Sequence, residues 1–223
     1  MDEGSLGDWY FPSSGRNGDH GGGEYDSGNG DSTISRARAH SGSFSAAQRI
    51  DVSNGSSSGT RLFRWREPDQ HRELYYSAWF YFPRRMRVKG WFMPMQFKSR
   101  DATRNDPLWG LLVENDGAGA MKFYLSQGPS EIANFHQSIA TIPVGKWFNL
   151  RAQYRCATDN TGYIRVWQDG RLIFAKTGIR TSYAYTNSYG NPWSCQWAVN
   201  AYGDGFSPPN WTHYMDDASI SSP

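Results

Sequence analysis

The sequence predicts an all-β fold, a two-sheet antiparallel β-sandwich. From Arg61 onward, apolar and polar residues alternate with a period of two, which is typical of half-buried strands. Aromatic residues make up 16% of the chain, and flat rings suit the pleated surface of a sheet. The amphipathic patterns that would indicate helices nowhere exceed about two turns.

The first predicted strands come from the N-terminal half. Residues 34–52 alternate small and polar side chains like an edge strand. Residues 61–67 place Phe63 and Trp65 on one face of a strand and Arg64 and Arg66 on the other. Residues 74–83 are aromatic on both faces, as expected of a central strand.

Later segments continue the pattern. Residues 91–99 set Met95 and Phe97 opposite Gln96 and Lys98. Further strands are expected within these ranges: 109–116, 121–127, 146–156, 162–178, 195–205 and 214–221. Inside residues 162–178, the pair Asp169-Gly170 between two apolar runs indicates a β-hairpin. About ten short strands separated by turns predict a sandwich or jelly roll.

Domain organisation follows from composition. Residues 1–22 are rich in Gly, Ser and Asp, and we expect a flexible segment there. We expect one β-sandwich domain over residues 23–223. The first residues lack the basic and apolar regions of a signal peptide, so either it was removed or the chain was cut from a longer protein. We expect a secreted or periplasmic protein.

Net charge and hydropathy limit the classes of partner that we expect this protein to bind. The net charge is only +2, so we expect no nucleic-acid partner. The sequence has no run of about 20 apolar residues, so we expect no membrane span. The chain has 18 Arg against 5 Lys, which suits bidentate binding of carboxylates or sulfates. An Arg-favouring, GC-rich genome would produce the same bias. We expect a monomer.

The two cysteines, Cys156 and Cys195, leave two interpretations open. They could form one bridge between strands in an oxidising compartment, or remain two buried thiols.

Several segments, taken in order, resemble one clan of carbohydrate-active proteins. They are AHSGSFSAA, FRWRE, YYSAWFYFP, MQFKS, GKWFNLRAQYRCATDNTGYIRVWQDGRLIF, WAVNAYGDG and YMDDASIS, within residues 39–221. The set resembles the concanavalin-A-like jelly rolls, most closely the heparin-lyase-I and glucuronan-lyase type of polysaccharide lyase. The resemblance implies a polysaccharide partner and cleavage of a uronic-acid polymer by β-elimination. A non-catalytic carbohydrate-binding module or lectin-like domain is the alternative, because this scaffold hosts several functions.

The resemblance also implies catalytic residues. Tyr202 matches the late-strand tyrosine that such lyases use as acid or base. Asn200 and Gln196 share its face, and Gln96 stands where such enzymes often begin a Gln-x-His pair. Here the second member is Lys98, which could neutralise a carboxylate or, with its pKa lowered by burial, act as a base.

Substrate-binding candidates lie nearby. Arg64 and Arg66 fall on the polar side of their strand and could clamp an acidic sugar. His136 could supply an imidazole from a loop across the groove. A hydrolase is disfavoured, because its usual strand-borne acid pattern, E-x-D-x-x-E, is absent.

A structural calcium ion is the expected metal. The pair Asp216-Asp217 resembles the closing strand of sandwich modules, in which an N-terminal acid, here Glu24 or Asp26, completes a Ca²⁺ site. Plain turn chemistry is the alternative. Zinc spacing of His and Cys is absent, and we expect no organic cofactor.

Overall fold

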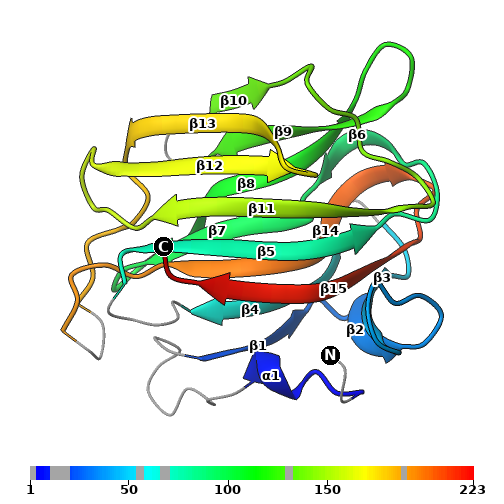
Figure 1. Cartoon of the computed structure of the whole chain (residues 1–223), viewed down its shortest axis with the longest axis horizontal. Coiled ribbons are helices and arrows are strands. Elements are labelled where there is room, and N and C mark those ends of the chain that lie inside the picture. Colours follow the sequence, from blue (N-terminus) through cyan, green and yellow to red (C-terminus); the bar gives the residue numbers. More distant parts are fainter. Residues whose placement is uncertain (1–3, 11–20, 54–57, 66–70, 129–132, 187–189) are drawn as a thin grey trace.

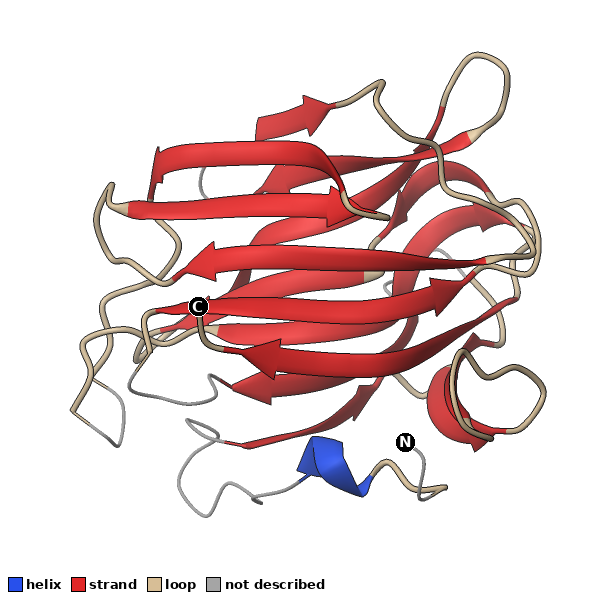
Figure 2. Ribbon diagram, viewed as in Figure 1, coloured by secondary structure: helices blue, strands red, loops and turns tan. Residues whose placement is uncertain are grey.

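The computed structural model describes residues 4–10, 21–53, 58–65, 71–128, 133–186 and 190–223. Two antiparallel sheets stack face to face, with one short helix, α1 (Gly7–Tyr10), beneath one edge (Figures 1 and 2). The predicted fold class is confirmed.

One sheet has eight strands. Its spatial order is β1 (Gly21–Asp26), β4 (Ser58–Trp65), β14 (Gln196–Ser207), β7 (Met95–Arg100), β8 (Asn105–Asn115), β9 (Met121–Gln127) and β10 (Ala133–His136), with β6 (Arg87–Phe92) paired to β14. β14 is the longest strand of this sheet and lies near its centre. Its first part pairs with β7 and its last part pairs with β6.

The other sheet has seven strands. Its order is β13 (Arg171–Ile179), β12 (Gly162–Gln168), β11 (Trp147–Arg155), β5 (Glu73–Tyr81), β15 (Trp211–Ser221), β3 (Ser45–Ile50) and β2 (Gly30–Ser35). The Asp169-Gly170 hairpin joins β12 to β13, and both residues have positive φ, 48° and 76°, as a primed two-residue turn requires.

The core lies between the sheets and follows strand parity. On β14, Trp197, Val199 and Ala201 are buried in the core cluster, so the alternate residues face outward. Phe97 of the eight-stranded sheet stacks on Tyr154 of the seven-stranded sheet, with ring centroids 4.2 Å apart. Such aromatic contacts across the layers account for much of the aromatic content.

Part of the segment expected to be flexible packs on the sandwich. Trp9 of α1 is 5% exposed, and its ring lies 5.6 Å from that of Trp197. Through Trp9, the helix therefore covers one edge of the core. Residues 11–20 lie outside the described residues.

Cys156 and Cys195 form a disulfide with a Cα–Cα distance of 6.3 Å. Cys156 follows β11 in one sheet, and Cys195 precedes β14 in the other. The bridge therefore links the two sheets, which decides between the two interpretations of these cysteines.

Candidate functional site

Four of the predicted site residues lie together on the outer face of the eight-stranded sheet. Lys98 of β7 is the cross-strand neighbour of Gln196 of β14. Gln96 lies two residues before Lys98 on the same face, and Asn200 lies on the same face of β14 as Gln196. Side chains on directly opposed strand positions have Cβ atoms about 5 Å apart, which applies to Lys98 and Gln196. Gln96 is opposite Ala198, and Asn200 lies two residues further along β14, so the four polar groups share one face of the sheet.

The neighbouring strand β4 adds three outward residues, Arg61, Phe63 and Trp65. Arg61 lies directly opposite Asn200. Together with β1, β7 and β14, they enclose a hollow of about 240 Å³, which we call the basic hollow. Its lining residues are Tyr25, Arg61, Phe63, Trp65, Lys98, Arg100, Asn105 and Gln196.

Lys98 sits deep in the basic hollow and is only 9% exposed. Burial, with the nearby charge of Arg61, lowers the pKa of its ammonium from 10.5 to about 8, while Asp106 acts in the opposite direction. A fraction of the Lys98 side chains is therefore in the neutral amine form near physiological pH. Proton transfer is most efficient when the pKa of the catalytic group lies near the working pH.

Tyr202 lies on the same face but farther along β14. Six residues separate it from Gln196, which places their Cα atoms about 20 Å apart on an extended strand. Arg61 links the two ends, because its guanidinium carbon lies 4.9 Å from the ring centre of Tyr202 and its side chain also lines the basic hollow. On its other side, Arg61 lies 4.0 Å from the ring centre of Tyr25.

Two buried amides on the same face as Arg61 keep unused hydrogen-bonding atoms. Gln96 is 1% exposed, and its Oε1 and Nε2 have no hydrogen-bond partner among the described residues. Asn200 donates to the carbonyl of Met93 (3.1 Å), and its Oδ1 has no partner there either. Unpaired polar atoms are costly in a folded protein, and at a functional site they serve a ligand.

The structure corrects the prediction for Arg64. Its strand neighbours Phe63 and Trp65 face the basic hollow, so Arg64 points to the interior side of the sheet. There it donates to the carbonyl oxygens of Asp8 (2.7 Å) and Trp9 (3.2 Å) at the end of α1. Polarity suggested the wrong face, because this arginine satisfies backbone carbonyls instead of facing solvent. Arg66 lies outside the described residues.

His136 is on a strand, not in a loop. It ends β10, on the outer face of the same sheet, and its Nδ1 lies 2.7 Å from Glu114 Oε2. Strands β8 and β9 lie between β10 and β7, so the imidazole is well separated from Lys98. The structure does not bring His136 to the basic hollow.

The acidic residues proposed for calcium do not form one ligand set. Glu24 Oε1 accepts from Ser32 N (2.8 Å) and Thr60 Oγ1 (3.1 Å). Asp26 accepts from the amide of Gly28 in its own turn. Among the described residues, no group of three or more His, Cys, Asp or Glu could hold a metal ion.

Asp216 and Asp217 bind the loop before β3 instead. Asp216 Oδ2 accepts from the amides of His40 and Ser41, and Asp217 contacts His40 Nδ1 (2.6 Å) and Ser41 Oγ (2.6 Å). These donors occupy the carboxylate oxygens that a hard cation would need. Calcium binding itself stays a prediction.

Arg61, Arg100 and Trp65 are site residues that the sequence analysis did not select. Trp65 was assigned by its apolar character to the core face, whereas in the structure it lines the basic hollow. The available signal was the parity shared by Arg61, Phe63 and Trp65, which alternates with the buried Leu62. An arginine that shares one strand face with two aromatic rings favours a sugar-binding face, because arginine is rarely buried in a core.

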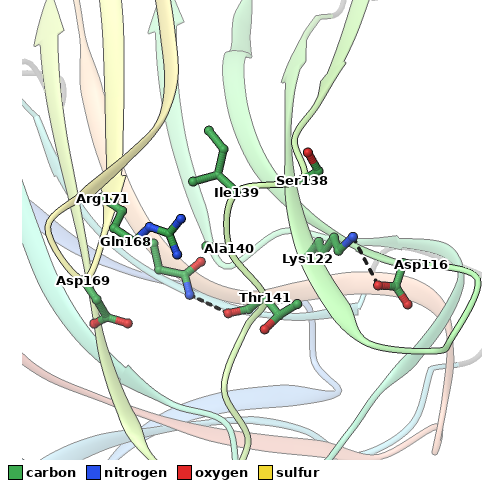
Figure 3. Close-up of a pocket in the computed structure, with 9 residues that line it drawn as sticks. All are labelled: Asp116, Lys122, Ser138, Ile139, Ala140, Thr141, Gln168, Asp169 and Arg171. Carbon is green, nitrogen blue, oxygen red and sulfur yellow. Dashed lines mark hydrogen bonds and ion pairs between the residues drawn. The ribbon is translucent and has the colours of Figure 1, made fainter.

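A second hollow, of about 380 Å³, lies at one end of the sandwich between the hairpins β8–β9 and β12–β13 (Figure 3). Lys122 is paired there with Asp116 (3.1 Å), and Gln168 donates to the carbonyl of Thr141 (2.7 Å). Its charged groups are already paired or exposed on turns. The basic hollow is therefore the stronger candidate for the functional site.

A jelly-roll sandwich with a basic, aromatic hollow on one sheet is the architecture of a carbohydrate-active protein. A family model described as polysaccharide lyase matches residues 20–219, and the chain belongs to this family. Its function is polysaccharide-lyase-like. No curated protein sequence is similar enough to count as a match.

Solved structures show the same fold at low identity. An endo-β-1,4-glucuronan lyase from Trichoderma reesei is 14% identical, with 90% of each chain covered and a TM-score of 0.65. An alginate lyase from a Chlorella virus is 12% identical, with 92% of this chain and 94% of that chain covered and a TM-score of 0.58. An alginate lyase from Aplysia kurodai is 14% identical, with 90% and 89% covered and a TM-score of 0.59.

The family match also indicates where such proteins are found relative to the cell. Members of the polysaccharide lyase family are typically extracellular. In the part of the chain that the structure describes, no helix is long and apolar enough to cross a membrane.

Proposed function

We propose that this protein cleaves a uronic-acid polysaccharide by β-elimination on the outer face of its eight-stranded sheet. The observation that carries the proposal is Lys98, a lysine with its pKa lowered to about 8 in a hollow shared with two arginines. A neutral polymer would give these cations no partner. The similar glucuronan and alginate lyases support an acidic substrate.

The uronate carboxylate has to be neutralised before the C5 proton can leave, because negative charge develops next to it. Arg61 could pair with that carboxylate. Asn200, directly opposite Arg61, and Gln96, on the other side of β14, offer unpaired amide atoms on the same face. These three residues are our proposed carboxylate-binding group. Arg100 and Gln196 line the same hollow and would contact neighbouring sugars.

In the proposed reaction, the neutral amine of Lys98 takes the C5 proton. The electrons of the C5–H bond form the C4–C5 double bond, and the bond from C4 to the bridging oxygen breaks. The departing oxygen takes up a proton. Water supplies it if the Tyr202 hydroxyl, about 20 Å along β14 from the cross-strand neighbour of Lys98, does not reach that oxygen, and Tyr202→Phe distinguishes the two donors. The products are a new reducing end and a chain that begins with a 4,5-unsaturated uronate.

We also propose that the protein is secreted and acts as a monomer. The disulfide between Cys156 and Cys195 supports the first point, because such bonds persist in oxidising compartments.

The test is the rise in ultraviolet absorbance from unsaturated uronates on glucuronan, alginate, heparin and pectate. We expect at least one polymer to be cleaved by the wild type and the rate to fall by about 100-fold or more in Lys98→Met. If no polymer releases product while the protein is retained on a polysaccharide gel, the protein is a binding module and the proposal is wrong.

A further inference from the structure

The outer face of the seven-stranded sheet, opposite the basic hollow, carries an unusual set of side chains. They come from three strands, β5, β11 and β12, which are neighbours in the sheet (Figure 1). We call this set the arginine–aromatic surface. It consists of Tyr75, Arg151, Tyr163, Arg165 and Trp167.

Strand register brings these residues into contact. Arg151 is the cross-strand neighbour of Trp167, and Gln153 has Tyr75 on one side and Arg165 on the other. The guanidinium carbon of Arg151 lies 4.3 Å from the ring centre of Tyr75 and 5.9 Å from that of Trp167. The guanidinium therefore contacts the rings of both neighbouring strands, and little side-chain entropy is left to lose on binding.

Charge on this face is unbalanced. The outward positions of β5, β11 and β12 hold the arginines 151, 155 and 165 but a single acid, Glu73. Glu73 is already used, because Gln153 Nε2 donates to it and Tyr163 is hydrogen-bonded to it. Arg151 is exposed and makes no ion pair with any described residue. Its planar fork is free to bind an oxyanion bidentately.

The rings are partly exposed although the core is complete beneath them. Tyr75, Tyr163 and Trp167 are each of intermediate exposure, while the alternate residues of the same strands fill the core. Packing of the sandwich does not need these three outward rings. Rings combined with an unpaired guanidinium match a sugar ring that carries a carboxylate, with its C–H groups on the rings and its charge on the arginine.

We infer that the arginine–aromatic surface is a second binding site for acidic polysaccharide, separate from the basic hollow. The inference rests on the proposed function for its choice of polymer, since the polymer that is cleaved is also the one present at high local concentration. Because the site lies on the opposite sheet, it holds the enzyme on the polymer without taking part in cleavage. Two linked contacts raise the effective concentration of the second one.

The experiment is electrophoresis through gels cast with an acidic polymer, glucuronan or alginate, or with neutral hydroxyethyl cellulose. Lys98→Ala serves as the background, so that the polymer is not consumed. We expect this protein to be slowed by an acidic polymer, and Arg151→Ala and Trp167→Ala to weaken that retention about fivefold or more each. Arg85→Ala removes the same charge from an exposed loop elsewhere and should leave retention unchanged.

Activity separates this inference from the proposed function. Trp167→Ala should keep its rate on short uronate oligosaccharides and lose rate on dilute polymer. If the wild type releases no unsaturated product but retention still depends on Arg151 and Trp167, the second site stands and the lyase proposal fails.

Other outcomes would overturn the inference. Retention that is unaffected by Arg151→Ala and Trp167→Ala, or equal in the neutral gel, would show that this face does not bind acidic polymer. A change of oligomeric state in Trp167→Ala, measured by light scattering, would make the surface an interface between copies. Tighter binding of single-stranded DNA than of any uronan would assign the surface to nucleic acid.

Discussion

The guanidinium of Arg61 is held between the rings of Tyr25 and Tyr202, 4.0 Å from the first ring centre and 4.9 Å from the second. This arrangement fixes a cation over the polar row of β14, directly opposite Asn200. It also places positive charge close enough to Lys98 to lower the pKa of that amine further than burial does alone. Carboxylate binding and base activation thus depend on the same arginine.

The pH dependence of cleavage tests the role of Lys98. Since the amine has to be neutral to act as a base, kcat/KM should rise about tenfold per pH unit below pH 8 and level off above it. Lys98→Arg keeps the positive charge but cannot lose its proton near neutral pH. It should therefore lose about 100-fold or more in rate while still binding acidic polymer. A rate in Lys98→Arg close to the wild type would assign the lysine to binding alone.

Lys98 should also lower the stability of the fold at neutral pH. The pKa of Lys98 is about 8 in the folded state and 10.5 in the unfolded chain. Between pH 8 and pH 10.5 the unfolded chain therefore binds more protons than the folded protein. The destabilisation is therefore fully present below pH 8 and is lost as pH rises to 10.5. Lys98→Met should raise the free energy of unfolding by about 1–3 kcal/mol at pH 7 and by less at pH 10. Denaturant titrations at both pH values measure it.

Tyr202→Phe separates two functions of one side chain. The substitution keeps the ring that contacts Arg61 and removes only the hydroxyl. If the hydroxyl protonates the departing oxygen, the rate should fall by about 100-fold or more with the melting temperature almost unchanged. Tyr202→Leu, which also removes the ring, should in addition raise KM, because Arg61 loses a contact. A rate in Tyr202→Phe within twofold of the wild type would leave Tyr202 only the role of positioning Arg61.

Strand parity predicted much of the site and failed where a distant segment intervened. On β7 and β14, polar and apolar residues alternate cleanly, and Gln96, Lys98, Gln196 and Asn200 do share the outer face. On β4, both parities contain residues that suit either face. The deciding contact comes from α1, more than 50 residues earlier, where two backbone carbonyls accept from Arg64.

Properties that depend on how deeply a side chain is buried could not be predicted from the sequence either. The sequence allowed Lys98 to be either a solvated cation or a base. Only the packing of side chains from β1 and β4 around it determines how much water it loses, and so its pKa. The same holds for the distance between Lys98 and Tyr202, which depends on the register of β7 against β14.

The disulfide should contribute substantially to stability. It closes a segment with a sequence separation of 39, which in the chain-entropy model stabilises the fold by roughly 3–4 kcal/mol. Thiol counting in denatured, unreduced protein should find no free thiol. Cys156→Ser/Cys195→Ser should lower the midpoint of unfolding and increase the slope of the denaturant transition, because the unfolded chain without the bridge exposes more surface. Two free thiols in freshly secreted protein would contradict the bridge.

Asp217 distinguishes calcium binding from hydrogen bonding. A bound ion would stabilise the folded state by mass action, so chelator would lower the melting temperature and Asp217→Ala would abolish that effect. The hydrogen bonds from His40 and Ser41 favour a different result, a melting temperature that Asp217→Ala lowers equally with and without chelator. Thermal melts of both proteins, with metal content measured, decide between them.

Acid should unfold the protein partly through His213. This imidazole is fully buried, close to the rings of Phe82 and Phe92, and its Nδ1 accepts from Trp211 Nε1 (3.0 Å). Burial lowers its pKa from 6.5 to about 3, so the unfolded chain binds more protons between these values. The stability is fully present above pH 6.5 and is lost as pH falls toward 3, by about 4 kcal/mol at most.

His213→Gln does not titrate and keeps an acceptor for Trp211. The variant is expected to be less stable than the wild type at pH 7, because its shape differs from that of a ring. Between pH 6.5 and 4, however, its free energy of unfolding should fall less steeply than that of the wild type. Urea titrations at four pH values in this range measure both slopes. Parallel slopes would mean that other groups cause the acid sensitivity and that His213 does not titrate on unfolding in this range.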